Sequence, residues 1–307
     1  MLRFVGRRLW SGGLTLAALV TLTFFVMRLA PGGPFSRNRK ISPEVQANIE
    51  AAFHLDEPIW MQFGRFVWGV LRFDLGPSTR HRDYSVNDLI ASGLPYSLTI
   101  GFWAVVVATL AGVALGIAGA LRRNGVTDYV AGIVGVTGIA IPIFVIGPVM
   151  QVIFGLRLEW LPIGGWDGSW RSLVLPVIVL ALPNIAYISR LTRTSMIETL
   201  RENYVRTARA KGIGWRRVLW RHTLTGALLP VIAYLGPATA AIITGSILIE
   251  TIFAVPGIGR HFVDAALNRD YPLVMGITLL YGGLLILFNI GTDVVRALLD
   301  PRIRNER

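Results

Sequence analysis

The chain contains no cysteine among its 307 residues, and only 16% of its residues are charged. Without cysteine it can build neither a disulfide framework nor a thiolate metal site. Soluble domains carry about a quarter charged residues, so the shortage of charge indicates that lipid surrounds much of the chain. The charged residues are also spread unevenly, because long apolar runs alternate with short polar stretches.

Motifs that would hold a nucleotide or a catalytic metal are missing as well. Lysine occurs only at Lys40 and Lys211, and neither lies in the G-K-[ST] step of a phosphate-binding loop. The four histidines fall in polar segments and form no H-E-x-x-H pair. A membrane enzyme would need a nucleophile, a base or a metal cluster at membrane depth, and the sequence offers none.

Ionisable groups inside the apolar runs are scarce, although proton- or ion-coupled pumps depend on such groups. Arg28, Asp128 and Glu250 fall at the ends of predicted spans. Asp293 is the one internal candidate. Because Arg296 follows three residues later on the same helical face, we interpret the two as a local ion pair. The sequence therefore indicates no energy source within this chain.

Six apolar runs predict six membrane-spanning helices. The first has 21 residues, about 31 Å at the helical rise, and the sequence after it lacks a small-x-small cleavage site, so we interpret it as a retained signal anchor. The predicted spans are Leu9–Leu29, Tyr96–Leu121, Tyr129–Leu156, Leu173–Ile188, Ala227–Ile249 and Leu273–Leu299. The corresponding regions are the signal-anchor helix (1–31), an extracytoplasmic helical segment (32–95), a five-helix core (96–299) and a tail (300–307).

Basic residues determine the predicted orientation. The N-terminus, the turn after the second span, the loop between the fourth and fifth spans and the tail together hold 17 of them. The short loops on the opposite side hold four. Both termini and the long basic loop are therefore expected to be cytoplasmic.

The outer segment is expected to contain two helices. One would begin at Ser42-Pro43 and present Val45, Ile49 and Phe53 on one face. The other would begin near Ile59, with an apolar face formed by Phe63, Phe66, Val67 and Val70 and with Trp60 and Trp68 at the membrane interface. A cap on the outer mouth of a pathway and a packed connector are equally compatible with this pattern.

Prolines and glycines mark the spans. The prolines, which can kink a helix within a bundle, are Pro142, Pro148, Pro176, Pro183, Pro230 and Pro237. Gly112-x-x-x-Gly116 permits close approach of a neighbouring helix, and we interpret this motif as packing.

The basic loop, residues 189–225, predicts a helical hairpin. Met196, Leu200, Tyr204 and Ala208 recur at every fourth position and predict one apolar stripe. Gly212-Ile213-Gly214 would break this helix, and Trp215 would begin a second one. Small residues at the tip (Ala208, Ala210, Gly212) would allow the hairpin to enter a cleft of a partner. An arginine-rich hairpin lying on anionic lipid headgroups is the alternative.

The run Thr207-Ala208-Arg209-Ala210-Lys211-Gly212, continuing to Leu228-Leu229-Pro230, resembles the EAA loop of permeases in binding-protein-dependent ABC importers. Arg206 stands where that motif usually has glutamate, and Pro230 lies farther from Gly212 than usual; both departures resemble the peptide-importer branch. Four further segments are similar to the oligopeptide and dipeptide permease B family: Arg28–Gly32, Phe73–Leu89, Glu250–Gly259 and Asp300–Arg302.

The resemblance implies an all-α type I ABC importer permease fold with six spans in the bacterial inner membrane. It also implies that Thr207, Ala208, Arg209, Ala210, Lys211 and Gly212 form the loop that couples to an ATPase. The implied partners are a second homologous permease, two cytoplasmic ATPases and an extracytoplasmic peptide-binding protein. ATP and Mg would be bound by the ATPases, with no cofactor in this chain.

Oligopeptides are the implied cargo, favoured by the match around Asp83–Leu89. Dipeptides, nickel and glutathione are alternatives on the same fold. A secondary transporter or channel without an ATPase is the alternative from another class, but it predicts intramembrane relays of acids or histidines that the sequence lacks.

Overall fold

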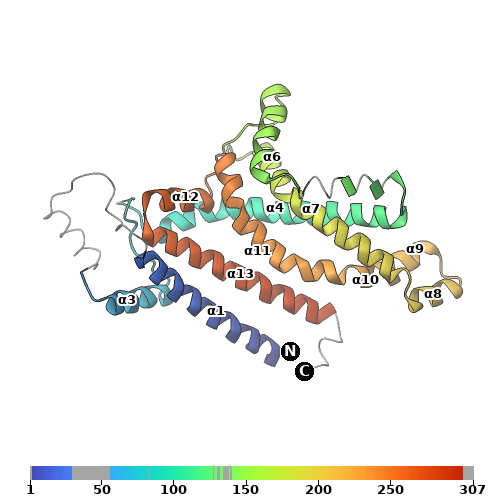
Figure 1. The fold of residues 1–307 in the computed structure, drawn as a ribbon, viewed down its shortest axis with the longest axis horizontal. Helices are drawn as coiled ribbons and strands as arrows, with labels where there is room; N and C mark the ends of the chain where they lie inside the picture. Colours follow the sequence, from blue (N-terminus) through green and yellow to red (C-terminus); the bar gives the residue numbers. More distant parts are fainter. Residues whose placement is uncertain are drawn as a thin grey trace.

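The computed structural model describes residues 2–29, 56–81, 83–126, 128–129, 132–133, 138 and 140–299, and most of these residues are helical. Five helices are long and apolar enough to cross a membrane. They are α1 (Leu2–Leu29), α4 (Val86–Leu121), α7 (Trp170–Thr199), α11 (Leu229–Ile252) and α13 (Tyr271–Leu299). Together they form an elongated bundle (Figure 1). The prediction of an all-α membrane protein is confirmed.

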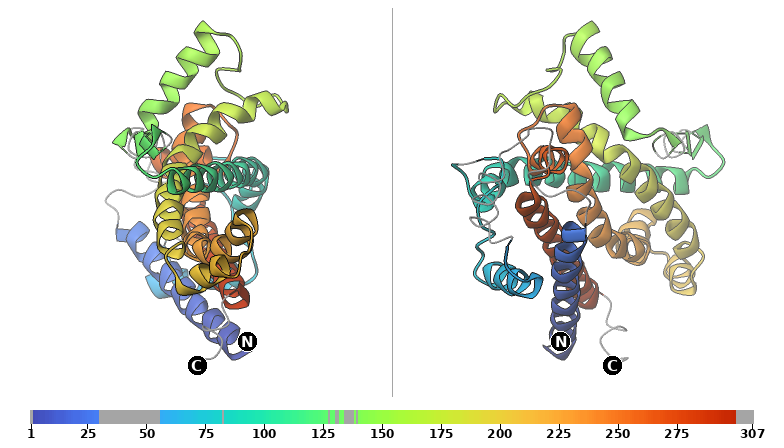
Figure 2. Two further views of the ribbon diagram at one scale, coloured as in Figure 1. Left: turned by 90° about the vertical axis from the view of Figure 1, so that its right-hand side faces the viewer. Right: turned by 60° about the vertical axis from the view of Figure 1, so that its left-hand side comes forward.

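The predicted third span is not one continuous helix. The chain leaves the helical conformation at Ile141–Pro142, where Pro142 is extended with ψ at 140°, and α6 (Ile143–Met150) begins after it. Proline lacks the N–H that a helix interior requires, which explains the break. A π-helical stretch, η1 (Gln151–Arg157), continues α6. Ile143, Ile146 and Met150 of α6 pack against the core of the bundle, and η1 projects from it (Figure 2). Several residues of the first half of this span lie outside the described residues.

Several helices extend beyond their predicted spans, and α4 and α7 do so the furthest. α4 begins at Val86 rather than at Tyr96, because Ser85 and Asp88 form a capping box: the Asp88 N–H donates to Ser85 Oγ at 3.1 Å, and the Ser85 N–H donates to Asp88 Oδ2 at 3.0 Å. α7 continues to Thr199 instead of ending at Ile188. A hydropathy pattern detects only the apolar part of a helix. It therefore does not predict helical turns that continue into a polar sequence.

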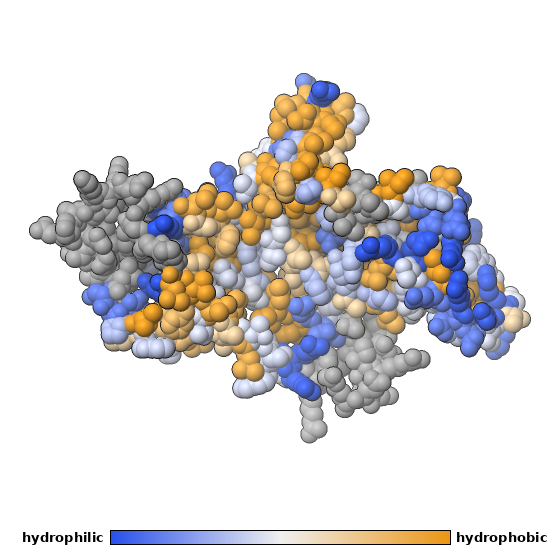
Figure 3. Space-filling model, in the orientation of Figure 1, coloured by the Kyte–Doolittle hydropathy of each residue, from blue (hydrophilic) through white to orange (hydrophobic). Residues whose placement is uncertain are grey.

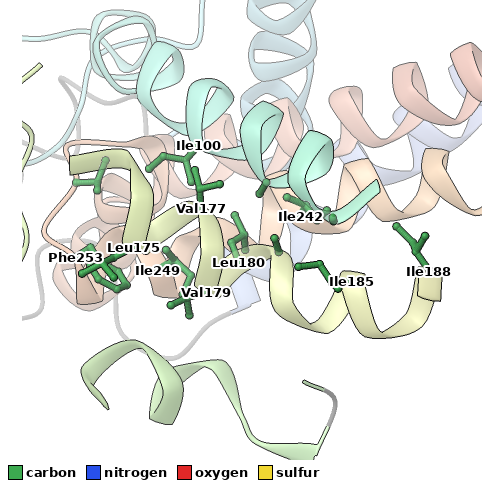
Figure 4. Packing of buried hydrophobic residues seen from close by; sticks show 14 of the residues in the cluster. Ile100, Leu175, Val177, Val179, Leu180, Ile185, Ile188, Ile242, Ile249 and Phe253 are labelled. Atoms are coloured by element: carbon green, nitrogen blue, oxygen red, sulfur yellow. The ribbon is translucent and has the colours of Figure 1, made fainter. Parts of the chain in front are cut away.

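The main hydrophobic core lies between α4, α7 and α11. Figure 4 shows its side chains, among them Ile100 from α4, Ile242 from α11, and Val177, Leu180, Ile185 and Ile188 along α7. α4 and α7 run parallel, since Gly112 lies against Ile188 and Gly116 against Thr192. These two glycines bring the helices close together, which confirms the interpretation of the motif as packing.

Replacing Gly116 by alanine should destabilise this contact. The added Cβ would lie 2.5 Å from Thr192 Cβ and 2.6 Å from the Ser189 carbonyl oxygen, and neither can move without shifting α7. Overpacking of this kind costs about 1–3 kcal/mol. Thermal unfolding of the purified protein in detergent measures the loss. Gly283→Ala is the matched control, because a Cβ there meets nothing within 4 Å, so an unchanged Gly116→Ala protein would contradict the expectation.

α1 and α13 lie side by side and antiparallel (Figures 1 and 2). Gly12 lies against Ile286 of α13, and Arg8 Nε lies 3.1 Å from Asp293 Oδ2. Asp293 was expected to pair with Arg296, whose side chain lies outside the described residues. On α11, Gly236 lies against Thr292. The beginning of α1, the end of α13 and the beginning of α11 therefore share one end of the bundle.

The outer segment contributes α3 (Ile59–Leu71), which confirms the second of its two predicted helices. Phe63 and Phe66 pack against Phe24 near the end of α1, with ring centroids 5.3 and 5.6 Å apart. Trp60 and Trp68 are exposed, as expected for interface residues. The helix predicted from Ser42 lies outside the described residues. α12 (Ile258–Asn268) lies at the same end of the bundle as α3 (Figure 1).

Candidate functional site

The basic loop forms a compact hairpin at the opposite end of the bundle from α3 and α12 (Figure 1). After α7 the chain turns at Leu200–Glu202 and continues as α8 (Asn203–Ala210). It returns through α9 (Trp215–Arg217), the π-helical η2 (Val218–Thr223) and α10 (Leu224–Ala227), which leads into α11. We call residues 200–227 the hairpin.

The predicted continuous apolar stripe is wrong. Because the helix breaks at Leu200–Glu202, Met196 and Ala208 lie on different helices. Tyr204 is 48% exposed, and Val205 takes the buried position on α8. Fourfold spacing missed Val205. Val205 could have been identified from its spacing of three residues to Ala208, because residues three apart, like residues four apart, lie on one helical face.

A Schellman motif builds the tip of the hairpin. The N–H of Gly212 donates to the Arg209 carbonyl at 2.9 Å, and the N–H of Ile213 donates to the Ala208 carbonyl at 3.2 Å. Gly212 has φ at +74°, a left-handed conformation that side chains with a Cβ disfavour. The glycine that sequence spacing identified as a helix breaker is therefore required by the geometry of the turn.

A small apolar cluster holds the two arms of the hairpin together. Val205, Ala208 and Val218 are buried in it, and Ile213 packs against them. Ala208 is only 6% exposed. Of the small residues expected at the tip, Ala210 and Gly212 are exposed, whereas Ala208 supports the hairpin from inside.

The outer surface of the hairpin is strongly cationic, and hydrophilic side chains cover this end of the molecule (Figure 3). Its exposed basic residues are Arg201, Arg206, Arg209, Lys211, Arg216, Arg217 and Arg221. The Arg209 guanidinium lies 4.6 Å from the centroid of the Trp215 ring, which orients it across the tip. Thr207 is also exposed. The structure therefore brings five of the six predicted site residues to one surface.

The hairpin is packed firmly onto the bundle. Leu219, Leu224 and Ala227 share a buried cluster with Met196 of α7 and Ala120 of α4. Tyr204 packs beside Gly226, because a Cβ there would lie 2.9 Å from the Tyr204 hydroxyl. Movement of α8 would therefore be transmitted to α4 and α7 by packing and to α11 along the chain.

An ion pair joins the turn after α4 to α7 beside the hairpin. Arg193 donates through Nε to Asp128 Oδ1 at 2.5 Å and through Nη2 to Oδ2 at 2.7 Å, a two-point contact. The Asp128 side chain is 11% exposed. The hydrogen bonds from Arg193, followed by that from the Asn124 N–H, lower the pKa of Asp128 to about 2.

Asp128→Asn should lower the melting temperature of the purified protein at pH 7. The pKa of Asp128 is below its ordinary value of 3.8, so its stabilisation is complete above about pH 4 and disappears as the pH falls toward 2. The difference from wild type should shrink over the same range. The exchanged pair Asp128→Arg with Arg193→Asp should recover stability at pH 7. A double variant as unstable as Asp128→Asn would contradict a role for the ion pair.

The chemistry of the hairpin surface suits docking. Among the described residues there is no group of three or more histidines and acids that could hold a metal ion. Cationic side chains and exposed small residues at a rigid tip suit contact with another macromolecule.

Comparison with known proteins identifies the family of the chain. Residues 112–305 match the family model described as the inner membrane component of binding-protein-dependent transport systems, and residues 1–101 match the model of the N-terminal part of such membrane components. The oligopeptide transport system permease protein OppB of Escherichia coli (strain K12) is 50% identical over 305 residues, covering 99% of this chain and 100% of that protein.

The dipeptide transport system permease protein DppB of Bacillus subtilis (strain 168) is 42% identical over 304 residues, covering 99% of this chain and 98% of that protein. Among solved structures, the inward-facing MetNI methionine ABC transporter has a chain of similar fold, with a TM-score of 0.54 and 16% identity over 69% of this chain and 96% of that one. The chain therefore belongs to the family of inner membrane components of binding-protein-dependent transport systems, the permease subunits of bacterial ABC importers, which are transport subunits rather than enzymes.

Proposed function

We propose that the chain is the permease subunit of an ATP-driven oligopeptide importer. The observation that carries this proposal is the 50% identity to an oligopeptide permease over nearly the whole of both chains. The 42% identity to a dipeptide permease favours dipeptides as the second candidate cargo. Six spans and cytoplasmic termini are part of the proposal. The location of the termini supports this part of the proposal, because the beginning of α1, the end of α13 and the hairpin lie at the same end of the bundle.

Within this importer the hairpin is the element that docks on the ATPase. Its exposed docking residues are Thr207, Arg209, Ala210, Lys211 and Gly212, and Ala208 fixes the hairpin beneath them. Closure of two ATP-bound partner subunits would push on α8. The packing of the hairpin on Met196 and Ala120 would transmit this push to α7 and α4. The partner subunits bind ATP and Mg. This chain contributes a rigid hairpin, which transmits their movement to the membrane helices.

Affinity purification in mild detergent tests the proposal. An importer of this class should yield this chain together with one homologous permease and two ATPase subunits. After reconstitution with its extracytoplasmic peptide-binding protein, the complex should take up labelled oligopeptides only when ATP is supplied. Uptake driven by an ion gradient alone, or purification of this chain as a lone homodimer, would contradict it. Preference for dipeptides over longer peptides would favour the second candidate cargo.

A further inference from the structure

A polar patch lies on the side of α7 that faces away from α4. It consists of Asn184, Tyr187 and Arg190 of α7 and Tyr234 of α11. The Tyr234 hydroxyl donates to Asn184 Oδ1 at 3.0 Å, and its ring stacks on Tyr187 with centroids 4.3 Å apart. The Arg190 guanidinium lies 5.7 Å from the Tyr187 centroid. Both Tyr187, at 38%, and Arg190 are exposed.

The polar patch lies at the depth of the membrane. Gly112 of α4 contacts Ile188, and Gly116 contacts Thr192, so Arg190 is level with Ala114. From there α4 carries no charged residue until Arg122, which is about 12 Å further along the helix at 1.5 Å per residue. The sequence had assigned Arg190 to the cytoplasmic loop. The structure instead places it on a transmembrane helix, level with an apolar stretch of α4.

An exposed arginine at this depth is incompatible with a lipid-facing surface. Charged groups within spans face a bundle interior or a water-filled cavity. Among the described residues, no carboxylate forms a salt bridge with Arg190 within 4.0 Å. The exposed residues of α4 closest to that level are Leu110, Ala114 and Ala118, and all three are apolar, as lipid contact requires. The polar patch therefore faces the interior of the assembled importer, where it meets water, a polar ligand or the second permease subunit, and not lipid.

We propose that the polar patch lines the path of the peptide through the inner half of the membrane. The Arg190 guanidinium receives the carboxylate that ends every linear peptide, through two parallel N–H···O bonds. The stacked tyrosines offer a rigid surface along which side chains of any type can slide. This assignment rests on the proposed peptide cargo, but the position of the polar patch on a water-filled path can be tested without any peptide.

Cysteine labelling tests the water-filled path. Because the chain has no cysteine, Tyr187→Cys places a single thiol on it. Leu110→Cys is the matched control, since Leu110 is level with Ala186 but lies on the apolar face. In the reconstituted complex, a charged, membrane-impermeant thiol reagent should modify Cys at 187 at least about tenfold faster than at 110, because thiolates form in water and not in lipid. Equal rates, or no reaction at 187, would overturn the assignment.

Transport of peptide pairs tests the role of Arg190. A peptide and its C-terminal amide are compared, chosen so that the wild type imports both. Loss of a charge-assisted hydrogen bond, about 1.5–3 kcal/mol, predicts that Arg190→Gln slows the free acid by about ten- to 150-fold. The amide should be slowed much less, and Arg190→Lys should preserve part of the preference. Equal slowing of both peptides would overturn the carboxylate role. A wild type that imports no peptide but passes the labelling test would contradict the cargo and not the path.

Discussion

Replacing Ala210 by tryptophan is expected to reduce strongly both peptide import and the ATP hydrolysis coupled to it, while the chain still inserts and folds. Ala210 is the last residue of α8 and is exposed at the tip. A tryptophan there is compatible with the helix, but its indole would fill the space into which the partner must fit. Overpacking costs about 1–3 kcal/mol, occasionally more, which corresponds to about five- to 150-fold weaker docking.

Two measurements separate docking from folding. The amount of ATPase retained on the purified permease should fall, and peptide-stimulated ATP hydrolysis in vesicles should fall with it, whereas the melting temperature of the permease should not change. Ala266→Trp is the matched control, because Ala266 is an exposed alanine of α12 at the opposite end of the bundle. Normal coupling in the Ala210→Trp complex would show that the hairpin tip is not the docking surface.

Gly212→Trp is a less informative version of the same experiment. A Cβ at Gly212 would meet no neighbour within 4 Å, so there is room for the side chain, but the positive φ of +74° would strain any residue other than glycine. Loss of coupling in that variant could not be separated from a distorted turn. Ala210 has helical geometry and avoids this problem.

Glu250→Leu is expected to produce a large loss of stability. Glu250 is completely buried at the end of α11. Its Oε2 accepts from the Gly259 N–H at 2.7 Å, and its Oε1 accepts from Ser246 Oγ at 2.6 Å. A Cβ at Gly257 would overlap the carboxylate, so this glycine leaves room for it. The side chain therefore ties α12 to the end of α11.

Leucine would leave the buried Gly259 N–H without its acceptor, whereas the Ser246 hydroxyl could still donate to the Ile243 carbonyl at 2.7 Å. An unsatisfied buried donor costs about 1–3 kcal/mol, which is a substantial part of the stability of an ordinary domain. Glu250→Gln, which keeps one carbonyl oxygen, should lose less. Glu198→Leu, at an exposed position of α7, should be nearly neutral. The yield of folded protein and its melting temperature in detergent measure these differences; a Glu250→Leu protein as stable as wild type would contradict the anchoring role.

Several features of the fold could be predicted from single residues and their neighbours. Long runs without charge predict helices in lipid, because desolvating a charge or an unpaired backbone group is costly wherever the run lies in the fold. The break at Gly212 could be predicted for a similar reason, since a glycine between helical patterns indicates a local turn. The EAA-like segment indicated the family because its residues are contiguous in the chain.

Other features depended on contacts between residues far apart in the sequence. Hydropathy assigned Glu250 to the end of a span, but its burial depends on Gly257 and Gly259 approaching from α12. Ala208 was expected at the tip and lies inside the hairpin, because Val218 covers it. The spacing of four residues could not predict the burial of Ala208, because a spacing pattern describes one helix and contains no information about the segment that packs against that helix.

By itself the sequence determined the membrane class, the helical content, the family and the basic hairpin, because each of these follows from the solvent preference or conformational preference of residues that are neighbours in the chain. Only the tertiary structure decided which face of each helix is covered. The extension of α7 to Thr199 and its parallel packing on α4 place Arg190 on a transmembrane helix, level with an apolar stretch of α4, instead of in a loop. Burial is a property of what packs against a side chain, and that neighbour is usually distant in the sequence.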